Sequence, residues 1–173
     1  QLNRNNGLGK EVLAFILVPA GHAGANKELL HNLELPYQAV TSTDLYLTHY
    51  LNDSANDPVM NRIRAQKLRN SEEDKVKIFF VPSYLNGDDG VFNMPYYDLL
   101  VGMDLTAFPS YYEPWGYTPL ESLAFKVPTI TTTLAGFGLW VKEHYNMNHP
   151  GIEVIHREDG DASNVATRWI ITL

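Results

Sequence analysis

Residues 105–131 read LTAFPSYYEPWGYTPLESLAFKVPTIT, and their pattern is the strongest structural signal in the chain. The first four residues form a short apolar run that predicts a strand, residues 118–125 predict a helix, and residues 127–131 predict a second strand. The loop between the first strand and the helix carries Glu113, and the helix carries Glu121 near its start. Ligands of open α/β sheets bind beside the carboxyl ends of strands. The two glutamates are therefore the first candidates for a functional site.

Strands and helices alternate through the rest of the chain as well. Runs rich in β-branched and aromatic residues predict strands at residues 12–18, 75–81 and 152–155. Helices are predicted at residues 26–33, 57–68, 96–103 and 137–145 and from residue 162 onward. The Gly/Ala-rich residues 21–25 predict a loop. Five strands alternating with helices predict an α/β fold, a Rossmann-like parallel sheet with helices on both faces.

The composition is that of a globular protein with an acidic balance. The chain has 45% hydrophobic and 19% charged residues and a formal net charge of −7. This balance argues against a general nucleic-acid surface or an acidic-membrane surface. The absence of cysteine rules out disulfides and a thiolate zinc site, and it fits a cytoplasmic protein. No apolar run is long enough to cross a bilayer, so no membrane partner is expected.

The length of 173 residues fits one domain with a sizeable core, so residues 1–173 are predicted to form a single domain. The chain starts at Gln1 without an initiator methionine and stops at Leu173 within a predicted helix. We therefore expect a piece of a longer protein that is truncated at both ends.

Two roles are open for Glu121. The segment Thr118-Pro119-Leu120-Glu121 is typical of a helix start, with threonine at the N-cap and proline at the first helical position. In that interpretation Glu121 completes a capping box and accepts from a backbone N–H. Alternatively, Glu121 accepts hydrogen bonds from the hydroxyl groups of a ligand, while the N–H groups of the same helix start bind a phosphate. The spacing allows either role.

Glu113 precedes Pro114 in a loop and has Tyr111, Tyr112 and Trp115 as close neighbours in sequence. A carboxylate among aromatic side chains must be paired, hydrated or functional. Glycosyl transfer passes through an oxocarbenium-like state, by analogy with glycoside hydrolysis, and a carboxylate beside the sugar would stabilise it. Both a structural and a catalytic role are therefore open for Glu113.

Other polar clusters give weaker signals, and no metal is expected. His144 and His149 lack an acidic or cysteine partner at ligand spacing. Residues 53–57 are rich in oxygen-bearing side chains but lack the glycine and glutamate of a calcium loop, so a helix start is the better interpretation. Gly136-Phe137-Gly138 is not a phosphate-binding fingerprint, and a flexible turn before a helix explains it as well.

The segments FPSYYEPWGYTPLES at residues 108–122 and VPTITTTLAGFG at residues 127–138 closely resemble the glycogen synthases of the fungal and animal type, the family-3 glycosyltransferases. The resemblance continues upstream through residues 47–85 and covers most of residues 43–145. The first 40 residues match loosely, and the last 25 match hardly at all.

The resemblance implies a two-domain GT-B enzyme that transfers glucose from UDP-glucose to the non-reducing end of an α-1,4-glucan with retention. This chain would be most of its C-terminal, donor-binding domain. The resemblance implies Glu113 as the catalytic carboxylate, Glu121 as the residue that binds the ribose, and Tyr96 as the residue that stacks on uracil. The turn that holds the diphosphate and sugar would comprise Trp115, Gly116, Tyr117 and Thr118.

The implied partners are UDP-glucose and a glycogen or α-glucan acceptor, no cofactor is implied, and an oligomeric parent enzyme is compatible with the resemblance. The chain departs from the family because nothing before Val12 matches the Arg/Lys pair on the donor diphosphate, and because the acceptor-binding N-terminal domain is absent. The piece alone is therefore expected to be inactive. The alternatives are another retaining GT-B transferase with a different nucleotide sugar, or a non-catalytic nucleotide- or glucan-binding module.

Overall fold

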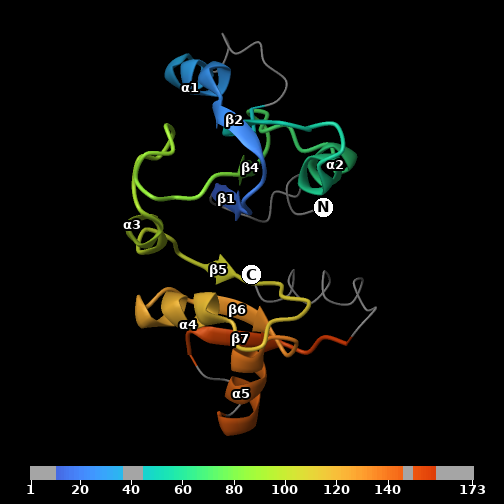
Figure 1. The fold of residues 1–173 in the computed structure, drawn as a ribbon, viewed down its shortest axis with the longest axis vertical. Coiled ribbons are helices and arrows are strands. Elements are labelled where there is room, and N and C mark those ends of the chain that lie inside the picture. Colours follow the sequence, from blue (N-terminus) through green and yellow to red (C-terminus); the bar gives the residue numbers. More distant parts are fainter. Residues whose placement is uncertain (1–10, 37–44, 146–149, 159–173) are drawn as a thin grey trace. The chain divides into compact units, whose positions relative to one another are not determined.

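The computed structural model describes residues 11–36, 45–145 and 150–158. The chain divides into two compact units, Gln1–Tyr96 and Tyr97–Leu173, and each unit is described by itself. Strands and helices alternate along both units (Figure 1). The helix expected from residue 162 onward lies outside the described residues. The structure is a mixed α/β chain in which small parallel sheets alternate with helices.

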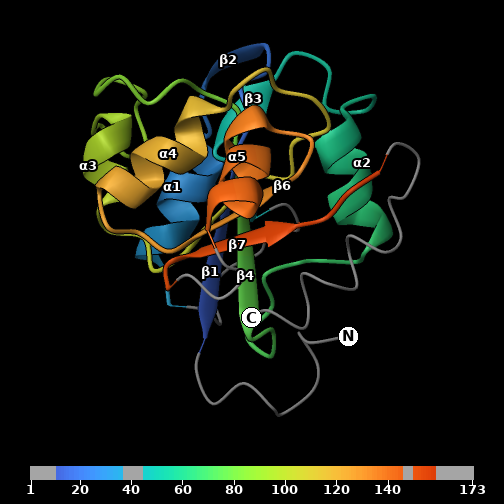
Figure 2. The same ribbon diagram turned by 90° about the horizontal axis from the view of Figure 1, so that it is seen from below.

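The sheet of the first unit pairs two apolar strands in parallel. β1 (Val12–Leu17) pairs with β4 (Val76–Val81) over their whole length. β1 is a continuous apolar run and β4 is apolar apart from Lys77, as expected of strands in a parallel sheet. The rings of Phe15 and Phe79 stack across the pair with their centroids 5.8 Å apart. Figure 2 shows the two strands side by side, and both predicted strands are confirmed.

A second strand pair is antiparallel and was missed by the sequence pattern. β2 (His22–Ala25) pairs with β3 (His49–Leu51). Small residues and glycine are depleted in strands, which is why residues 21–25 predict a loop. That prediction is wrong, because tertiary pairing overrides the weak propensity. The pairing continues beyond the strand ends, where the Asn52 N–H donates to the carbonyl of Gly21 at 2.9 Å.

The first helix is joined to the strands by its cap. α1 (Lys27–Glu34) begins after Asn26, whose side-chain oxygen accepts from the N–H groups of Glu28 and Leu29 at 3.1 Å each. The amide of Asn26 donates in turn to the carbonyl of Leu47 at 3.0 Å. One buried side chain thus satisfies two free helix donors and ties the helix to a neighbouring segment.

The second helix also starts at a side-chain cap. α2 (Pro58–Ala65) begins after Asp57, which accepts from the Met60 N–H at 2.8 Å. Residues 57–68 were the predicted range, and the helix ends earlier than expected because Lys67 takes a left-handed backbone conformation with φ 55°. Both predicted helices of this unit are confirmed, with small changes at their ends.

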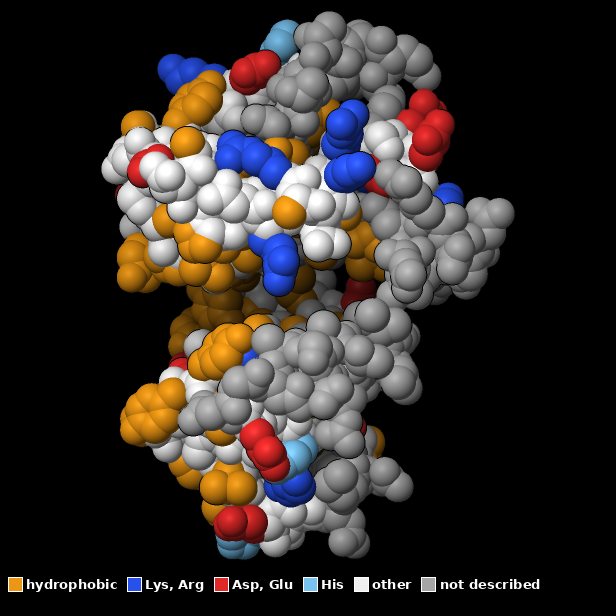
Figure 3. Space-filling view, turned by 90° about the vertical axis from the view of Figure 1, so that its right-hand side faces the viewer, with side chains coloured by type: hydrophobic (Ala, Val, Ile, Leu, Met, Phe, Trp, Pro, Cys, Tyr) orange, Lys and Arg blue, Asp and Glu red, His pale blue; other side chains and the backbone are white. Residues whose placement is uncertain are grey.

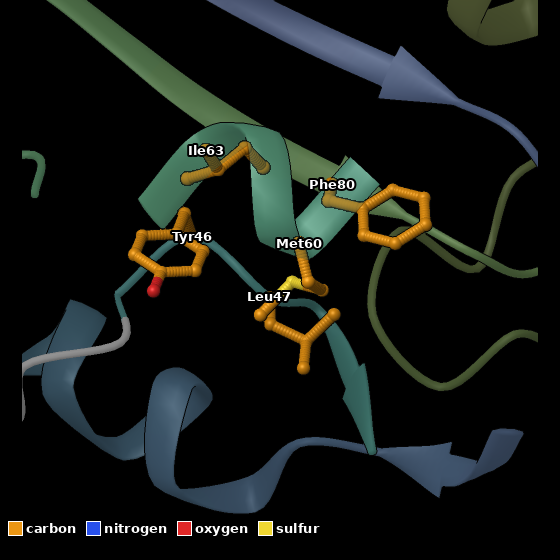
Figure 4. Packing of buried hydrophobic residues seen from close by; sticks show 5 residues of the cluster. All are labelled: Tyr46, Leu47, Met60, Ile63 and Phe80. Atoms are coloured by element: carbon orange, nitrogen blue, oxygen red, sulfur yellow. The ribbon is translucent and has the colours of Figure 1, made fainter. Parts of the chain in front are cut away.

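The core of the first unit lies between α2 and β4. Its buried hydrophobic cluster comprises Tyr46, Leu47, Met60, Ile63 and Phe80 (Figure 4). Met60 and Ile63 lie one turn apart on the same side of α2, and Phe80 is fully buried. Burying a side chain of this kind contributes about 1.5–3 kcal/mol.

The second unit is built on a three-stranded parallel sheet. β5 (Thr106–Ala107), β6 (Thr129–Thr132) and β7 (Ile152–Ile155) lie in that order. α4 (Tyr117–Ala124) connects β5 to β6, and α5 (Gly136–His144) follows β6. The strands and helices predicted for this part of the chain are confirmed.

α4 and α5 pack on the same face of this sheet. Ser122 Oγ of α4 lies 2.6 Å from Thr106 Oγ1, which lies 3.0 Å from Thr129 Oγ1. Thr131 shares the face of Thr129 because alternate strand residues point to the same side. α5 comes so close to this face that a Cβ at Gly138 would lie 3.1 Å from Thr131 Cγ2. Short threonine side chains therefore let both helices approach the sheet closely.

The single five-stranded sheet expected from the sequence needs correction. Among the described residues, β1 and β4 form one sheet and β5, β6 and β7 form another. The reason is that β4 lies in the first unit and β5 in the second, and the short β5 pairs with β6. α3 (Tyr96–Leu100) lies between them in sequence and ends before the predicted residue 103.

Apolar, acidic and basic side chains are interspersed on the surface seen in Figure 3. The outer side of α2 carries the exposed residues Arg62 and Arg64. Arg64 donates to the backbone carbonyl and to the Oγ of Ser54 at 2.9 Å each. Within the described ranges, every helix is too short or too polar to cross a membrane.

Candidate functional site

The loop between β5 and α4 is held at its centre by the segment that follows β6. The Glu113 N–H donates to the carbonyl of Leu134 at 3.2 Å, and the Gly136 N–H donates to the carbonyl of Glu113 at 3.1 Å. These bonds form a parallel bridge between Glu113 and Ala135. Glu113 therefore has the backbone pairing of a strand residue although it lies in a loop, and this pairing sets the direction of its side chain.

The half-buried carboxylate of Glu113 is held on one side. Ser110 Oγ donates to Glu113 Oε2 at 3.0 Å, and Oε1 has no donor within the described part of the chain. Gly116 lies against the same Oε2, because a Cβ there would be 3.0 Å from it. Gly116 also has φ +91°, a conformation that residues with a side chain rarely adopt. Glycine at this position lets the carboxylate lie against the start of α4.

The glycines of residues 136–138 are packing positions within α5. A Cβ at Gly136 would lie only 2.1 Å from the carbonyl oxygen of Pro114. The Phe137 N–H donates to the carbonyl of Trp115 at 2.7 Å, and their rings lie 5.8 Å apart. The interpretation of this segment as a flexible turn therefore needs correction, because its glycines allow a close contact with the Glu113 loop.

Of the two roles left open for Glu121, the capping box is wrong. α4 begins at Tyr117 after Gly116, so Thr118 lies inside the helix and Glu121 lies beyond the first turn. The left-handed Gly116 starts the helix earlier than a threonine cap would. Pro119 is tolerated because the first N–H groups of a helix have no internal acceptor. The first turn has neither a side-chain cap nor an acidic residue, which leaves its N–H groups available to an anion.

Glu121 instead accepts a hydrogen bond from Tyr97, a residue that the sequence did not single out. The Tyr97 phenol donates to Glu121 Oε1 at 3.0 Å, and its ring stacks on Phe125 with centroids 5.2 Å apart. The hydrogen bond to Glu121, with smaller effects of burial and of the charge of Glu121, raises the pKa of the Tyr97 phenol. The adjacent pair of tyrosines at 96 and 97 is the sequence signal that could have found it.

The structure brings six of the seven candidate residues into one short stretch of the second unit: Glu113, Trp115, Gly116, Tyr117, Thr118 and Glu121. The seventh, Tyr96, is the last residue of the first unit, where its N–H donates to the carbonyl of Leu85 at 2.9 Å. Its role beside Glu121 stays a prediction.

Arg157 is a second residue that the sequence did not point to. It follows β7, is 5% exposed, and donates from Nη1 to the carbonyl of Pro109 at 2.9 Å, at the start of the Glu113 loop. A lone arginine after a short strand gives no local pattern, and this contact joins residues 48 apart in sequence.

The described residues contain no group of three or more His, Cys, Asp or Glu side chains that could hold a metal ion. His144 packs on its own helix, with Nδ1 2.9 Å from the carbonyl of Trp140 and the two rings stacked at 5.0 Å. His149 lies outside the described residues. The contacts of His144 are those of a packed histidine at a helix end.

An open cavity of about 330 Å³ in the first unit is lined by Ala20, Gly21, Leu51, Asn52, Asp53, Asn56 and Asp57. The side-chain and backbone N–H groups of Asn56 donate to Asp53 and lower the pKa of its carboxyl group. Asp57 caps α2. The interpretation of residues 53–57 as a helix start is confirmed. The carboxylates of Asp53 and Asp57 accept hydrogen bonds from nearby residues of the same segment and of α2.

Comparison with known proteins supports the resemblance. The family model described as "Glycogen synthase" matches residues 4–168. The chain is 44% identical to "Glycogen [starch] synthase isoform 1" of Saccharomyces cerevisiae over 97 residues, which are 56% of this chain and 14% of that protein. It is 39% identical to "Glycogen [starch] synthase" of Neurospora crassa over 128 residues, 72% of this chain and 18% of that protein.

The human liver "Glycogen [starch] synthase" is 36% identical over 127 residues, 71% of this chain and 18% of that protein. The chain thus spans less than a fifth of the length of these curated relatives. Because the family model covers nearly all of its residues, this chain belongs to the glycogen synthase family.

Proposed function

We propose that this chain is the donor-binding part of a retaining glycosyltransferase that transfers glucose from UDP-glucose to the non-reducing end of an α-1,4-glucan. The setting of Glu113 carries the proposal. Its N–H and its carbonyl are both hydrogen-bonded to the segment after β6, and Ser110 donates to Oε2. Oε1 has no donor among the described residues and is available to a sugar. The glycogen synthase names of the relatives supply the acceptor class, and UDP-glucose is the donor that the family resemblance implies.

In the proposed reaction, Glu113 in the loop acts on the glucose ring, and the first turn of α4 binds the diphosphate. By analogy with glycoside hydrolysis, positive charge develops on the glucose ring as its bond to the diphosphate breaks. The fixed carboxylate of Glu113 stabilises that charge without having to reorganise. The leaving diphosphate is negative and suits the uncapped first turn of α4 at Tyr117 and Thr118, which Trp115 and Gly116 lead into.

We assign the nucleoside to Glu121 and Tyr96. Glu121 Oε1 is bonded to Tyr97, and Oε2 has no donor within the described ranges, so it can accept from a ribose hydroxyl. Tyr96 stacks on uracil in this proposal. The reaction so assigned uses carboxylates, backbone N–H groups and an aromatic ring, and it needs no cofactor.

We also propose that the chain belongs to the C-terminal, Rossmann-like domain of a GT-B enzyme, with helices on both faces of its sheet. The parallel order of β5, β6 and β7, with α4 and α5 on one face, supports the Rossmann-like sheet, and helices on the other face are part of the proposal. The rest of a complete enzyme would supply the acceptor-binding domain, since this chain spans under a fifth of its relatives. A cytoplasmic location is part of the same proposal.

The test uses the complete protein that carries this sequence, with radiolabelled UDP-glucose and, separately, ADP-glucose as donors and glycogen as acceptor. We expect label to enter glycogen from UDP-glucose and to be released by an enzyme that cleaves α-1,4 bonds. Incorporation from a different nucleotide sugar alone would indicate another retaining transferase. Binding of UDP or glucan without transfer from any donor would indicate a non-catalytic module.

A further inference from the structure

Arg157 is a buried cation at the carboxyl end of β7. Its residue is 5% exposed. Its backbone is fixed at both ends by one side chain, because the Arg157 N–H donates to Thr133 Oγ1 at 3.0 Å and Thr133 Oγ1 donates to the Arg157 carbonyl at 3.2 Å. The backbone position of Arg157 is therefore fixed by the β6–β7 pair and not by the loop that its side chain contacts.

The guanidinium of Arg157 contacts three consecutive residues of the Glu113 loop. Nη1 donates to the carbonyl of Pro109 at 2.9 Å and approaches the carbonyl of Ser110 at 3.4 Å. The guanidinium carbon lies 3.3 Å from the centroid of the Tyr111 ring, which is a cation–π contact. The Arg157 side chain thus contacts the loop immediately before Tyr112 and Glu113.

The positive charge of Arg157 has no acidic partner in the described part of the chain. The one ion pair there joins His156 to Glu158, and the buried Nε of Arg157 has no hydrogen-bond acceptor. Burying a charge is costly unless other groups compensate it. The groups that do so are two carbonyl oxygens and one ring face, and all belong to the Glu113 loop. A long apolar side chain would fill this space without the cost of burying a charge. The presence of a charge here therefore indicates that its contacts with the loop have a function.

A short chain of contacts leads from Arg157 to the carboxylate of Glu113. The carbonyl of Ser110 accepts from Arg157 Nη1 and also from Thr132 Oγ1 at 2.8 Å. With its backbone held in this way, Ser110 donates from Oγ to Glu113 Oε2. Freeing the Ser110 backbone would let its hydroxyl move and would release the carboxylate on the one side where it is held.

We propose that Arg157 is a positioning residue for Glu113: it holds Pro109, Ser110 and Tyr111 so that Ser110 keeps the Glu113 carboxylate aimed for glucosyl transfer. This rests on the proposed catalytic role of Glu113. Arg157 acts on the transfer step and not on the binding of the nucleotide. Lysine is no substitute, because it lacks the planar guanidinium that donates to carbonyls while it lies over a ring.

The kinetic test compares Arg157→Met and Arg157→Lys in the complete protein with Arg62→Met, an exposed arginine on α2, as the matched control. We expect both Arg157 variants to lower kcat by about 10- to 100-fold, because small displacements of reacting groups have effects of that size. The KM for UDP-glucose and the Kd for UDP should stay within about 2-fold, and Arg62→Met should match the unmodified protein.

A double variant separates positioning from general damage. If Arg157 acts through Glu113, adding Arg157→Met to Glu113→Gln should not lower the residual kcat further, because the two residues act as a unit. An equal proportional loss in both backgrounds would overturn the proposal, and so would an unchanged kcat in Arg157→Met. Near-normal transfer by Glu113→Gln alone would instead contradict the proposed function, so the two failures are distinguishable.

Hydrogen exchange gives a readout that does not depend on activity. Arg157→Met should lose protection at the N–H groups of Glu113 and Gly136, while those of Phe125 and Val127 at the end of α4 keep theirs. Uniform loss at all four sites would show a general structural role and contradict the proposal. If Arg157→Met fails to fold, the single variants Arg157→Lys and Ser110→Ala are used for the same comparisons. Ser110→Ala removes only the hydroxyl that donates to Glu113 Oε2.

Discussion

The phenol of Tyr97 donates a hydrogen bond of 3.0 Å to Oε1 of Glu121, and the Tyr97 ring stacks on Phe125, the C-cap residue of the helix that carries Glu121. The stacked ring limits the movement of the phenol, so the phenol in turn limits the rotamers of Glu121. The second carboxylate oxygen stays without a donor in the described residues. Glu121 is therefore held by one oxygen and can offer the other to a ligand.

Tyr97→Phe should weaken UDP binding by the complete protein without removing it. The substitution keeps the ring on Phe125 and deletes only the hydroxyl that orients Glu121. Because Glu121 itself remains, the loss of its orientation should weaken binding by about 3- to 10-fold in Kd.

Glu121→Ala should weaken UDP binding more than Tyr97→Phe, because it removes the carboxylate that we propose contacts the ribose. Calorimetric titration of UDP into the unmodified protein, Tyr97→Phe and Glu121→Ala gives the three Kd values to be compared. A Tyr97→Phe protein with a larger loss than Glu121→Ala would show that Tyr97 contacts the nucleotide directly and not through Glu121.

The stability contributed by Tyr97 should depend on pH at the alkaline end. The bond to Glu121 raises the pKa of the folded-state phenol above the value of about 10 found in unfolded chains. The contribution is then fully present below about pH 10 and is lost as the pH rises through the raised folded-state value. Urea unfolding of Tyr97→Phe and the unmodified chain should differ at neutral pH and converge in strong alkali.

Tyr117→Phe is the control for this pH dependence, because Tyr117 is 68% exposed and its phenol has no bond in the described structure. Its unfolding free energy should match that of the unmodified chain at neutral pH, where Tyr97→Phe differs. A Tyr97→Phe difference that stays constant through the alkaline range would show that the ring, not the hydroxyl bond, supplies the stability.

Gly136→Ala should destabilise the second unit and disturb the Glu113 loop. The new Cβ would lie 2.1 Å from the carbonyl oxygen of Pro114, so either α5 or the loop must move. Overpacking of this kind costs about 1–3 kcal/mol or more. Gly102→Ala is the matched control, because its Cβ would lie 3.4 Å from the carbonyl oxygen of Leu99. Thermal unfolding that ranks the two variants equally would contradict the close contact at Gly136.

The isolated 173-residue chain should bind UDP no better than about millimolar. The chain spans less than a fifth of its curated relatives, and each charge-assisted contact to the diphosphate that lies outside it would take away about 1.5–3 kcal/mol. Tyr96→Ala should abolish the remaining binding, which ligand-observed NMR can follow. Micromolar binding that survives Tyr96→Ala would place the nucleotide elsewhere.

The sequence predicted the elements whose signals are local. The apolar runs of β1, β4 and β7 and the helix starts at Asn26 and Asp57 needed only neighbouring residues, and the loop motif around Glu113 was long enough to indicate the family. These signals depend on propensity, periodicity and caps, which act within a few residues.

The features that the sequence missed depend on distant contacts. β2 (His22–Ala25) forms a strand from small residues because β3 pairs with it. The capping box at Glu121 failed because Gly116 takes a left-handed conformation that packs against Glu113. The partners of Tyr97 and Arg157 lie 24 and 48 residues away in sequence, where no local pattern reports them.

The rate of glucose transfer by Glu113→Gln in the complete protein tests the central claim most directly. Glutamine keeps the size of the side chain and removes the charge that we propose stabilises the transition state, so binding of UDP should stay within about 2-fold while kcat falls by several powers of ten. Initial rates of label transfer from UDP-glucose to glycogen, with UDP affinity measured on the same preparation, give both quantities. A near-normal rate of transfer by Glu113→Gln would contradict the assignment of Glu113 as the catalytic carboxylate.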